Sequence, residues 1–174
     1  ADIIMTARTS GQIDSQLAVT GDDRFKTFED LVPQVLAHNV RCLALPMDVS
    51  KPEQVRAVVA SAVEIFGGVD ILFNNAGTAF ASAFTETTSE AFQEAFNINV
   101  LGMIGVSQAV IASMMTRGGG NIINNASIYG LGAAPFVSAY VMTKHAIVGL
   151  TKTMALELGE ADIRVNVVCP GMVL

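Results

Sequence analysis

Tyr140 and Lys144 are the two residues of this sequence whose types and spacing best suit chemistry. Four positions apart in an expected helix, their side chains share one face, with Cβ atoms about 5–6 Å apart. A lysine ammonium beside a tyrosine favours the phenolate over the phenol, which makes the tyrosine a usable general acid or base. An isolated pair of this kind is more often a surface tyrosine beside a solvated lysine. The pair therefore needs support from the rest of the chain.

Two other groups of residues directly follow expected strands. Ser127 comes after the expected strand that ends at Ala126, and Asn75-Ala76-Gly77 follow the expected strand that ends at Asn74. In a parallel doubly wound sheet the ligand crevice lies outside the carboxyl ends of the strands, so both groups are candidates for a site. A cap or turn at Ser127 and a tight turn at Gly77 are the alternative explanations.

The apolar pattern that must position these residues alternates between short β-branched runs and longer helical periods. This alternation is typical of repeated βαβ units and a parallel sheet. We expect strands at residues 1–7, 40–47, 69–74, 121–126 and 163–168, and helices at about 24–38, 50–66, 87–117 and 138–158. The strand at 69–74 has no charge after Asp70, which predicts a central strand covered on both faces.

Local signals place the helix ends. Ser50 with Glu53, and Thr87 with Glu90, are predicted capping boxes. Pro33 suits a first helical turn better than a helix interior. The long helix that begins near Thr87 is predicted to bend near residues 97–99.

Composition limits the class of protein. The chain has 174 residues, of which 51% are hydrophobic and 15% charged, and its mean hydropathy is +0.49. These values predict one domain in which much of the chain is buried, as in a sheet flanked by two layers of helices. The net charge is −6, and the sequence has no run of Lys or Arg that could bind along a phosphate backbone. A nucleic acid is therefore not expected as a partner.

The sequence also bears on membrane, metal and secretion signals. The uncharged stretch 95–116 carries several polar residues and the stretch 118–143 is rich in Gly and Pro, so neither is expected to cross a membrane. Cys42 and Cys169 are far apart and belong to no CxxC, which favours buried free thiols. With only two histidines besides, no metal site is expected. The start of the chain shows no secretion pattern, so we expect a cytoplasmic protein.

Taken as a set, these residues resemble the classical short-chain dehydrogenase/reductases. The resemblance extends from the first expected strand to the end of the chain and rests on Asp48-Val49, Asn74-Asn75-Ala76-Gly77, Asn99, Ser127, Tyr140-x-x-x-Lys144, Arg164-Val165-Asn166 and Pro170-Gly171. It implies an α/β fold with a Rossmann-like, doubly wound parallel sheet in three layers. Residues 1–174 would form a single dinucleotide-binding and catalytic domain.

The resemblance also implies a reaction, the interconversion of an alcohol and a carbonyl by hydride transfer with NAD(P). Tyr140 would exchange the hydroxyl proton, Ser127 would bind the substrate oxygen, and Asn99 would support a water that relays protons. Lys144 would hold the nicotinamide ribose and assist Tyr140. The other cofactor contacts implied are Asp48 and Val49 at the adenine, Asn75, Ala76 and Gly77 at the adjoining ribose region, and Pro170, Gly171 and Val173 at the nicotinamide.

Arg8 bears on the choice of cofactor. It follows the expected strand 1–7, which the resemblance aligns with the second strand of the dinucleotide fold. An acidic residue at this place binds the ribose 2′-hydroxyl of NAD, whereas a basic residue accommodates the 2′-phosphate of NADP. Arg8 therefore favours NADP, with NAD as the alternative, and an ordinary solvated loop arginine is the competing explanation.

One departure from the family pattern is large. The first strand and the Gly-rich turn TGxxxGxG do not occur in this sequence, so we expect further residues before Ala1 and after Leu174 in the complete protein. Two functions follow. The first is an oxidoreductase acting on a small, partly apolar carbonyl or alcohol, as a homodimer or homotetramer. The second is an inactive member of the fold that serves as a binding or oligomerisation module.

Overall fold

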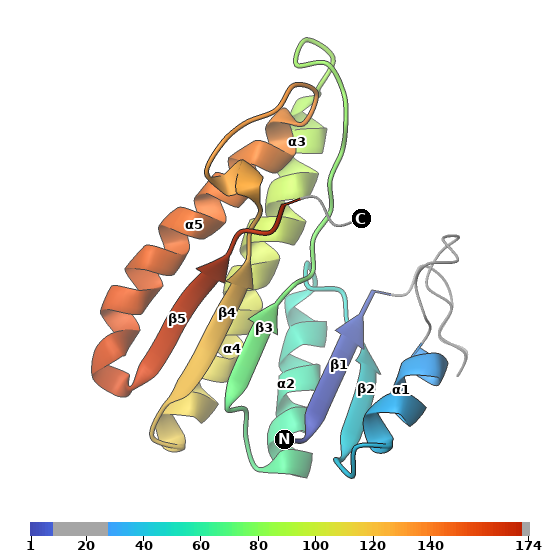
Figure 1. Cartoon of the computed structure of the whole chain (residues 1–174), viewed down its shortest axis with the longest axis vertical. Coiled ribbons are helices and arrows are strands. Elements are labelled where there is room, and N and C mark those ends of the chain that lie inside the picture. Colours follow the sequence, from blue (N-terminus) through green and yellow to red (C-terminus); the bar gives the residue numbers. More distant parts are fainter. Residues whose placement is uncertain (9–27, 172–174) are drawn as a thin grey trace.

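The computed structural model describes residues 1–8 and 28–171 of the chain (Figure 1). Within them, two sets of parallel strands run in the same direction. Their strands are β1 (Ile3–Ala7), β2 (Cys42–Pro46), β3 (Ile71–Asn74), β4 (Gly120–Asn125) and β5 (Ile163–Val168). The helices are α1 (Phe28–Leu36), α2 (Pro52–Phe66), α3 (Ser89–Phe96), α4 (Gly102–Thr116) and α5 (Ser138–Leu158). The alternation of parallel strands and helices confirms the predicted α/β fold.

The strands form a two-stranded sheet of order β1-β2 and a three-stranded sheet of order β3-β4-β5. Side chains rather than backbone hydrogen bonds join the two sheets. Val55 and Val58 of α2 pack with Met47, which follows β2, and with Val106 of α4. Leu72 of β3 packs against the same cluster. Helix α2 therefore bridges the two sheets.

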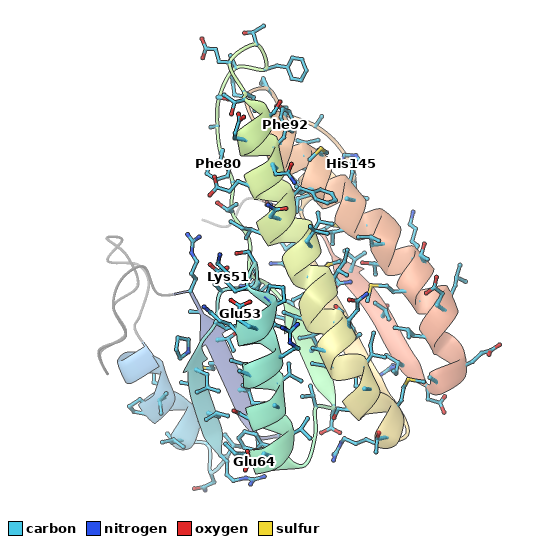
Figure 2. All side chains as sticks on the ribbon, turned by 180° about the vertical axis from the view of Figure 1, so that it is seen from behind. Lys51, Glu53, Glu64, Phe80, Phe92 and His145 are labelled. Carbon is cyan, nitrogen blue, oxygen red and sulfur yellow. The ribbon has the colours of Figure 1, made fainter. Side chains whose placement is uncertain are left out.

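Helices α2, α4 and α5 cover one face of the strands, as both views show (Figures 1 and 2). On the other face of β3, Ile71 is 60% and Phe73 54% exposed. The prediction that this strand is covered on both faces is therefore wrong for the described residues. The alternation of a strand puts Leu72 and Asn74 toward the helices and leaves Ile71 and Phe73 on the open side.

The core lies between the helices and the β4–β5 pair. Val110 and Met114 of α4 pack on Ile122 of β4 and on Ile163 and Val165 of β5. By length and hydropathy alone the helical run Ser89–Thr116 could cross a membrane. Less than half of this apolar window is buried in the fold, where residues such as Val110 and Met114 cover the sheet.

The run 89–116 is interrupted where the sequence predicts a bend. Residues Asn97–Leu101 form a π-helical turn between α3 and α4, and such turns often occur at functional sites. The cap of α3 is Thr88, whose side chain accepts a hydrogen bond from Ala91 N–H. The predicted capping box at Thr87 is therefore wrong by one residue. Thr87 Oγ1 donates instead to the carbonyl of Ala83.

Other local predictions also need correction. The N-cap of α2 is Lys51, with Pro52 in its first turn and no side-chain cap. Ser50 is instead held by Asp48, whose Oδ1 accepts from both its N–H and its hydroxyl. Pro33 lies inside α1 rather than in a first turn. Both cysteines are free, as predicted, but half-buried rather than buried.

Gly102, at the start of α4, lets this helix approach the loop after β2. A Cβ at this position would lie 2.6 Å from Val49 Cγ2 and 3.3 Å from the Val49 carbonyl oxygen. We expect Gly102→Ala to lower the free energy of unfolding of the full chain by about 1–3 kcal/mol because the Val49 backbone must move. Urea denaturation measures this change.

The matched control is Gly105→Ala on the same helix, where a Cβ meets nothing within 4 Å. This substitution should raise stability by up to about 1 kcal/mol through helix propensity. Equal effects of the two substitutions would contradict the close approach of α4 to Val49.

Candidate active site

The Tyr140–Lys144 pair lies on the first two turns of α5, where this helix passes the carboxyl end of β4. The Lys144 Nζ lies 5.3 Å from the centre of the Tyr140 ring and donates to the Asn125 carbonyl at 2.8 Å. Lys144 is only 5% exposed. Burial lowers the pKa of its ammonium, and the neighbouring Cys169 opposes this shift. The lysine is therefore not the solvated surface residue of the alternative explanation.

Ser127 directly follows β4 and is 8% exposed. Its Oγ accepts from the N–H of Tyr129 at 3.2 Å and caps the short 3₁₀ turn Ile128–Gly130. Tyr129 in turn lies edge-on to Tyr140, with ring centres 6.5 Å apart at an angle of 87°. The predicted cap at Ser127 is thus present, and the turn it starts leads directly to the Tyr140 ring.

The same turn packs closely on α5. A Cβ at Gly130 would lie 2.8 Å from the main-chain oxygen of Lys144 and 3.0 Å from Val148 Cγ2. The glycine therefore allows the loop after β4 to approach the helix at the position of Lys144. This approach brings Ser127 and the Tyr140–Lys144 pair to one end of the sheet.

Asn99 lies in the π turn, is 1% exposed, and links three segments. Its Oδ1 accepts from the N–H of Thr78 at 2.7 Å, and its Nδ2 donates to the Thr78 carbonyl at 2.9 Å. Nδ2 also donates to Thr143 Oγ1 at 3.0 Å, and Thr143 in turn donates to the Tyr140 carbonyl. Asn99 therefore fixes the loop after β3 and the first turns of α5 relative to each other.

Paired asparagines occupy the carboxyl ends of β3 and β4. Asn74 Nδ2 donates to Asn124 Oδ1 at 2.9 Å, and Asn125 Nδ2 donates to Asn75 Oδ1 at 2.7 Å. Asn75, Ala76 and Gly77 are all exposed. A Cβ at Gly77 would lie 3.2 Å from Asn99 Oδ1, so the glycine allows the chain to pass close to this side chain.

The ends of β4 and β5 are also joined. The N–H of Ile128 donates to the Pro170 carbonyl at 2.9 Å, and a Cβ at Gly171 would lie 3.8 Å from Ile128 Cγ2. Pro170 and Gly171 thus lie beside the turn that follows Ser127. The predicted cofactor residue Val173 lies outside the described residues.

Arg8, Asp48 and Val49 lie apart from this group, beyond the ends of β1 and β2. They line a groove of about 1190 Å³ between the start of α2, marked by Lys51 and Glu53 in Figure 2, and the α3–α4 run. Burial raises the pKa of Asp48, but the hydrogen bonds from Ser50 and the charges of Arg8 and Lys51 outweigh it, so the pKa is lower than usual. The positive charge of Arg8 therefore contributes to the lower pKa of Asp48.

Comparison with known proteins identifies the family. The family model described as short chain dehydrogenase matches residues 5–174. The chain belongs to the short-chain dehydrogenase family. A D-beta-hydroxybutyrate dehydrogenase of Rhizobium meliloti (strain 1021) is 38% identical over 171 residues, which are 97% of this chain and 66% of that protein.

Solved structures of the family resemble the fold closely. The structure of an L-sorbose reductase from Gluconobacter frateurii, complexed with NADPH and L-sorbose, has a TM-score of 0.85 and 34% identity, and the match covers 99% of this chain and 60% of that one. An NAD+-bound xylitol dehydrogenase has a TM-score of 0.79 and 38% identity, covering 82% and 55%. The chain thus spans less than two thirds of the length of these relatives.

Several residues of this short-chain dehydrogenase site were missed in the sequence. Thr143 connects Asn99 to α5, Ser107 accepts from Asn74, and Thr151 accepts from Asn124. A usable signal was the repeated Asn-Asn dipeptide at the ends of two expected strands, 74–75 and 124–125. Where two neighbouring parallel strands end in the same dipeptide, the asparagines of the two strands lie side by side.

Asn99→Ala should show how far the linkage of three segments stabilises this short-chain dehydrogenase. The substitution removes three hydrogen bonds and leaves the Thr78 main chain without its partner. We expect the free energy of unfolding of the full chain to fall by about 1–3 kcal/mol in a urea titration.

Asn97→Ala, in the same π turn, is the matched control and should change stability by less than about 0.5 kcal/mol. If Asn97→Ala lost as much stability as Asn99→Ala, the π turn would be sensitive to any substitution, and the loss could not be assigned to the Asn99 side chain.

Proposed function

We propose that the protein is an NAD(P)-dependent oxidoreductase that interconverts an alcohol and a carbonyl group. The observation that carries the proposal is the buried Lys144 ammonium beside the Tyr140 ring. A buried ammonium costs free energy unless it has several partners. Lys144 has three N–H donors, and within the described residues one acceptor, the Asn125 carbonyl, is present. Such a group suits a ligand that brings further acceptors.

The donor set around Lys144 fits the ribose of a nicotinamide cofactor. Two N–H groups of Lys144 are available for a pair of ribose hydroxyls, which are good acceptors. Asn75 is exposed at the same end of the sheet, and Ala76 and Gly77 follow it. Pro170 and Gly171 would border the nicotinamide. When bound, the nicotinamide ring supplies or accepts the hydride.

The residues of this chain would handle the proton. Tyr140 would give the proton to the carbonyl oxygen during reduction and take it back during oxidation, with the Lys144 ammonium 5.3 Å from the centre of its ring. Ser127 lies next to the turn that contacts the Tyr140 ring and would donate to the substrate oxygen. Its hydroxyl hydrogen is available, because Oγ acts as an acceptor toward Tyr129 N–H.

Asn99 contributes in a different way. Both hydrogens of its amide donate to Thr78 and Thr143, and its Oδ1 accepts from Thr78. Asn99 would support a water that relays protons to Lys144, while its side-chain bonds keep the π turn in place.

We propose NADP rather than NAD as the preferred cofactor. Arg8 is exposed, lines the groove with Asp48 and Val49, and carries a positive charge that acts on Asp48. A guanidinium at this place suits the 2′-phosphate of NADP through charge-assisted hydrogen bonds. One relative is solved with NADPH and another with NAD+, so the choice depends on residues of this chain.

The substrate would be a small, partly apolar carbonyl or alcohol. Ile128, Leu131 and Phe136 are between 45% and 70% exposed in the segment that joins Ser127 to α5. The Phe136 carbonyl accepts from the N–H of Ser82, which brings the loop after β3 to the same place. These side chains would cover the apolar part of a substrate.

We also propose a homodimer or homotetramer formed through the long helices. Large apolar side chains are exposed on their outer surfaces, namely Leu101 just before α4, Met115 at its end, and Met142 and Leu156 on α5. Burial of such side chains against a second copy would stabilise the assembly.

Tyr140→Phe tests the proton-transfer role. In the full chain we expect almost unchanged affinity for NADPH, because the ring remains, and a fall in kcat of at least about a hundredfold, because the proton donor is lost. Spectrophotometric assays of NADPH oxidation with a panel of carbonyl compounds measure this change.

Tyr129→Phe is the matched control, since this is the other tyrosine of the chain and its ring contacts Tyr140. The control should keep most of its kcat. A Tyr140→Phe variant that kept most of its kcat would contradict the assignment.

Arg8→Glu tests the cofactor preference. Loss of a charge-assisted contact and the added repulsion should weaken NADPH binding at least about tenfold while NADH binding changes little. Arg56→Glu, on α2 in the same groove, is the control for a general change of charge. If Arg8→Glu weakened both cofactors equally in calorimetric titrations, Arg8 would not contact the 2′-phosphate.

A further inference from the structure

Two asparagine pairs lie at the carboxyl ends of β3 and β4, one on each face of the sheet. Asn74 and Asn124 are directly opposite each other in the parallel register. Successive side chains of a strand point to opposite faces, so Asn75 and Asn125 form the second pair on the face away from the helices. The two pairs have the same residue types and nearly the same bond lengths, 2.9 and 2.7 Å.

Hydrogen bonds to the core helices explain the presence of the Asn74–Asn124 pair. Asn124 is 0% exposed, accepts from Asn74 and donates to Thr151 of α5. Asn74 also donates to Ser107 of α4. These bonds tie both strand ends to the two helices, which is a structural role.

Bonds to the core helices do not explain the Asn75–Asn125 pair. Asn125 Nδ2 donates to Asn75 Oδ1, but Asn125 Oδ1 is buried and has no partner among the described residues. A buried amide oxygen without a partner costs stability. A β-branched apolar residue would suit a strand position better. The stability of β4 therefore does not explain an asparagine at position 125.

Asn125 contacts two of the residues proposed to bind the cofactor. Its side chain holds the Asn75 amide, which is exposed at the end of β3, and its main-chain carbonyl accepts from Lys144 Nζ at 2.8 Å. Asn75 directly follows β3 and Lys144 lies on α5, and Asn125 bonds to both.

We propose that Asn125 is a positioning residue for cofactor binding, which orients the Asn75 amide through its side chain and the Lys144 ammonium through its carbonyl. The inference rests on the proposed function, since it concerns Asn75 and Lys144, which are assigned there to the cofactor. Asn125 takes no part in the transfer of the proton or the hydride. Its side chain acts before catalysis, by holding Asn75 in the orientation that the ligand requires.

This role predicts an effect on affinity without a matching effect on rate. Without the Asn125 amide, the Asn75 side chain is free to rotate, and the ligand must order it on binding. The Asn125 main-chain carbonyl remains in every variant, so Lys144 keeps its acceptor and stays beside the Tyr140 ring. The affinity for the cofactor falls moderately, whereas turnover at saturating cofactor is retained.

Asn125→Val in the full chain tests the inference. We expect the Kd for NADPH to rise about fivefold, as for the loss of one hydrogen bond, and kcat at saturating cofactor to change by less than about twofold. The melting temperature should stay the same or rise, because a buried unpaired oxygen is removed. Isothermal titration calorimetry gives the Kd directly.

The matched control is Asn121→Val, the same substitution on the same face of β4 at its other end. It should leave the Kd unchanged. Asn75→Ala is a second test of the pair, made at its exposed residue. This variant does not depend on how β4 tolerates valine. If the pair acts as a unit, the double variant Asn75→Ala/Asn125→Val should bind no more weakly than Asn75→Ala alone.

The outcomes separate this inference from the function on which it rests. A wild-type chain that binds NADPH or NADH while Asn125→Val binds equally well overturns the positioning role alone. A lower melting temperature with an unchanged Kd also overturns it, because this result indicates a merely structural residue. Additive losses of affinity in the double variant overturn it as well, because they show that Asn125 does not act through Asn75. A folded wild-type chain that binds neither cofactor overturns both proposals.

Discussion

The burial of the Lys144 ammonium is the constraint on which the arrangement of the site depends. A charged group that is 5% exposed must be held by hydrogen bonds, and the acceptor supplied by the described residues is the carbonyl at the end of β4. This bond requires α5 to pass close to that strand end. The small residue Gly130 allows the approach, since any side chain there would meet the Lys144 main chain.

The polar groups around this lysine form a connected set rather than a scatter of surface residues. Asn99 holds Thr78 and Thr143, Thr143 holds the first turn of α5, and Asn125 holds both Asn75 and Lys144. Most of these bonds join segments that are more than 20 positions apart. The loops after β3 and β4 and the start of α5 are therefore fixed relative to one another before any ligand binds, which lowers the ordering cost of binding.

Two of the elements around this set have the bounds that the sequence predicted. Helix α5 and strand β5 begin and end where the sequence predicted, at 138–158 and 163–168. Their signals were strong, namely a long helical period stopped by glycine and a β-branched run before Pro170. The helix caps were less predictable. Thr87 and Thr88 both suit a cap, and Thr87 instead uses its hydroxyl for Ala83, a choice made by the geometry of the preceding turn.

The sequence alone determined the α/β class, the order of the strands and helices, the bend near Asn99 and the Tyr140–Lys144 pair, because each depends on local periodicity or on spacing within one helix. Only the tertiary structure decided that Lys144 is buried, that Asn125 bonds to both Asn75 and Lys144, and that Ile71 and Phe73 lie on an open face. These features depend on which strand ends lie side by side and on which helix crosses them. Such contacts join residues that are 19 to 50 positions apart, so the periodicity within one element does not determine them.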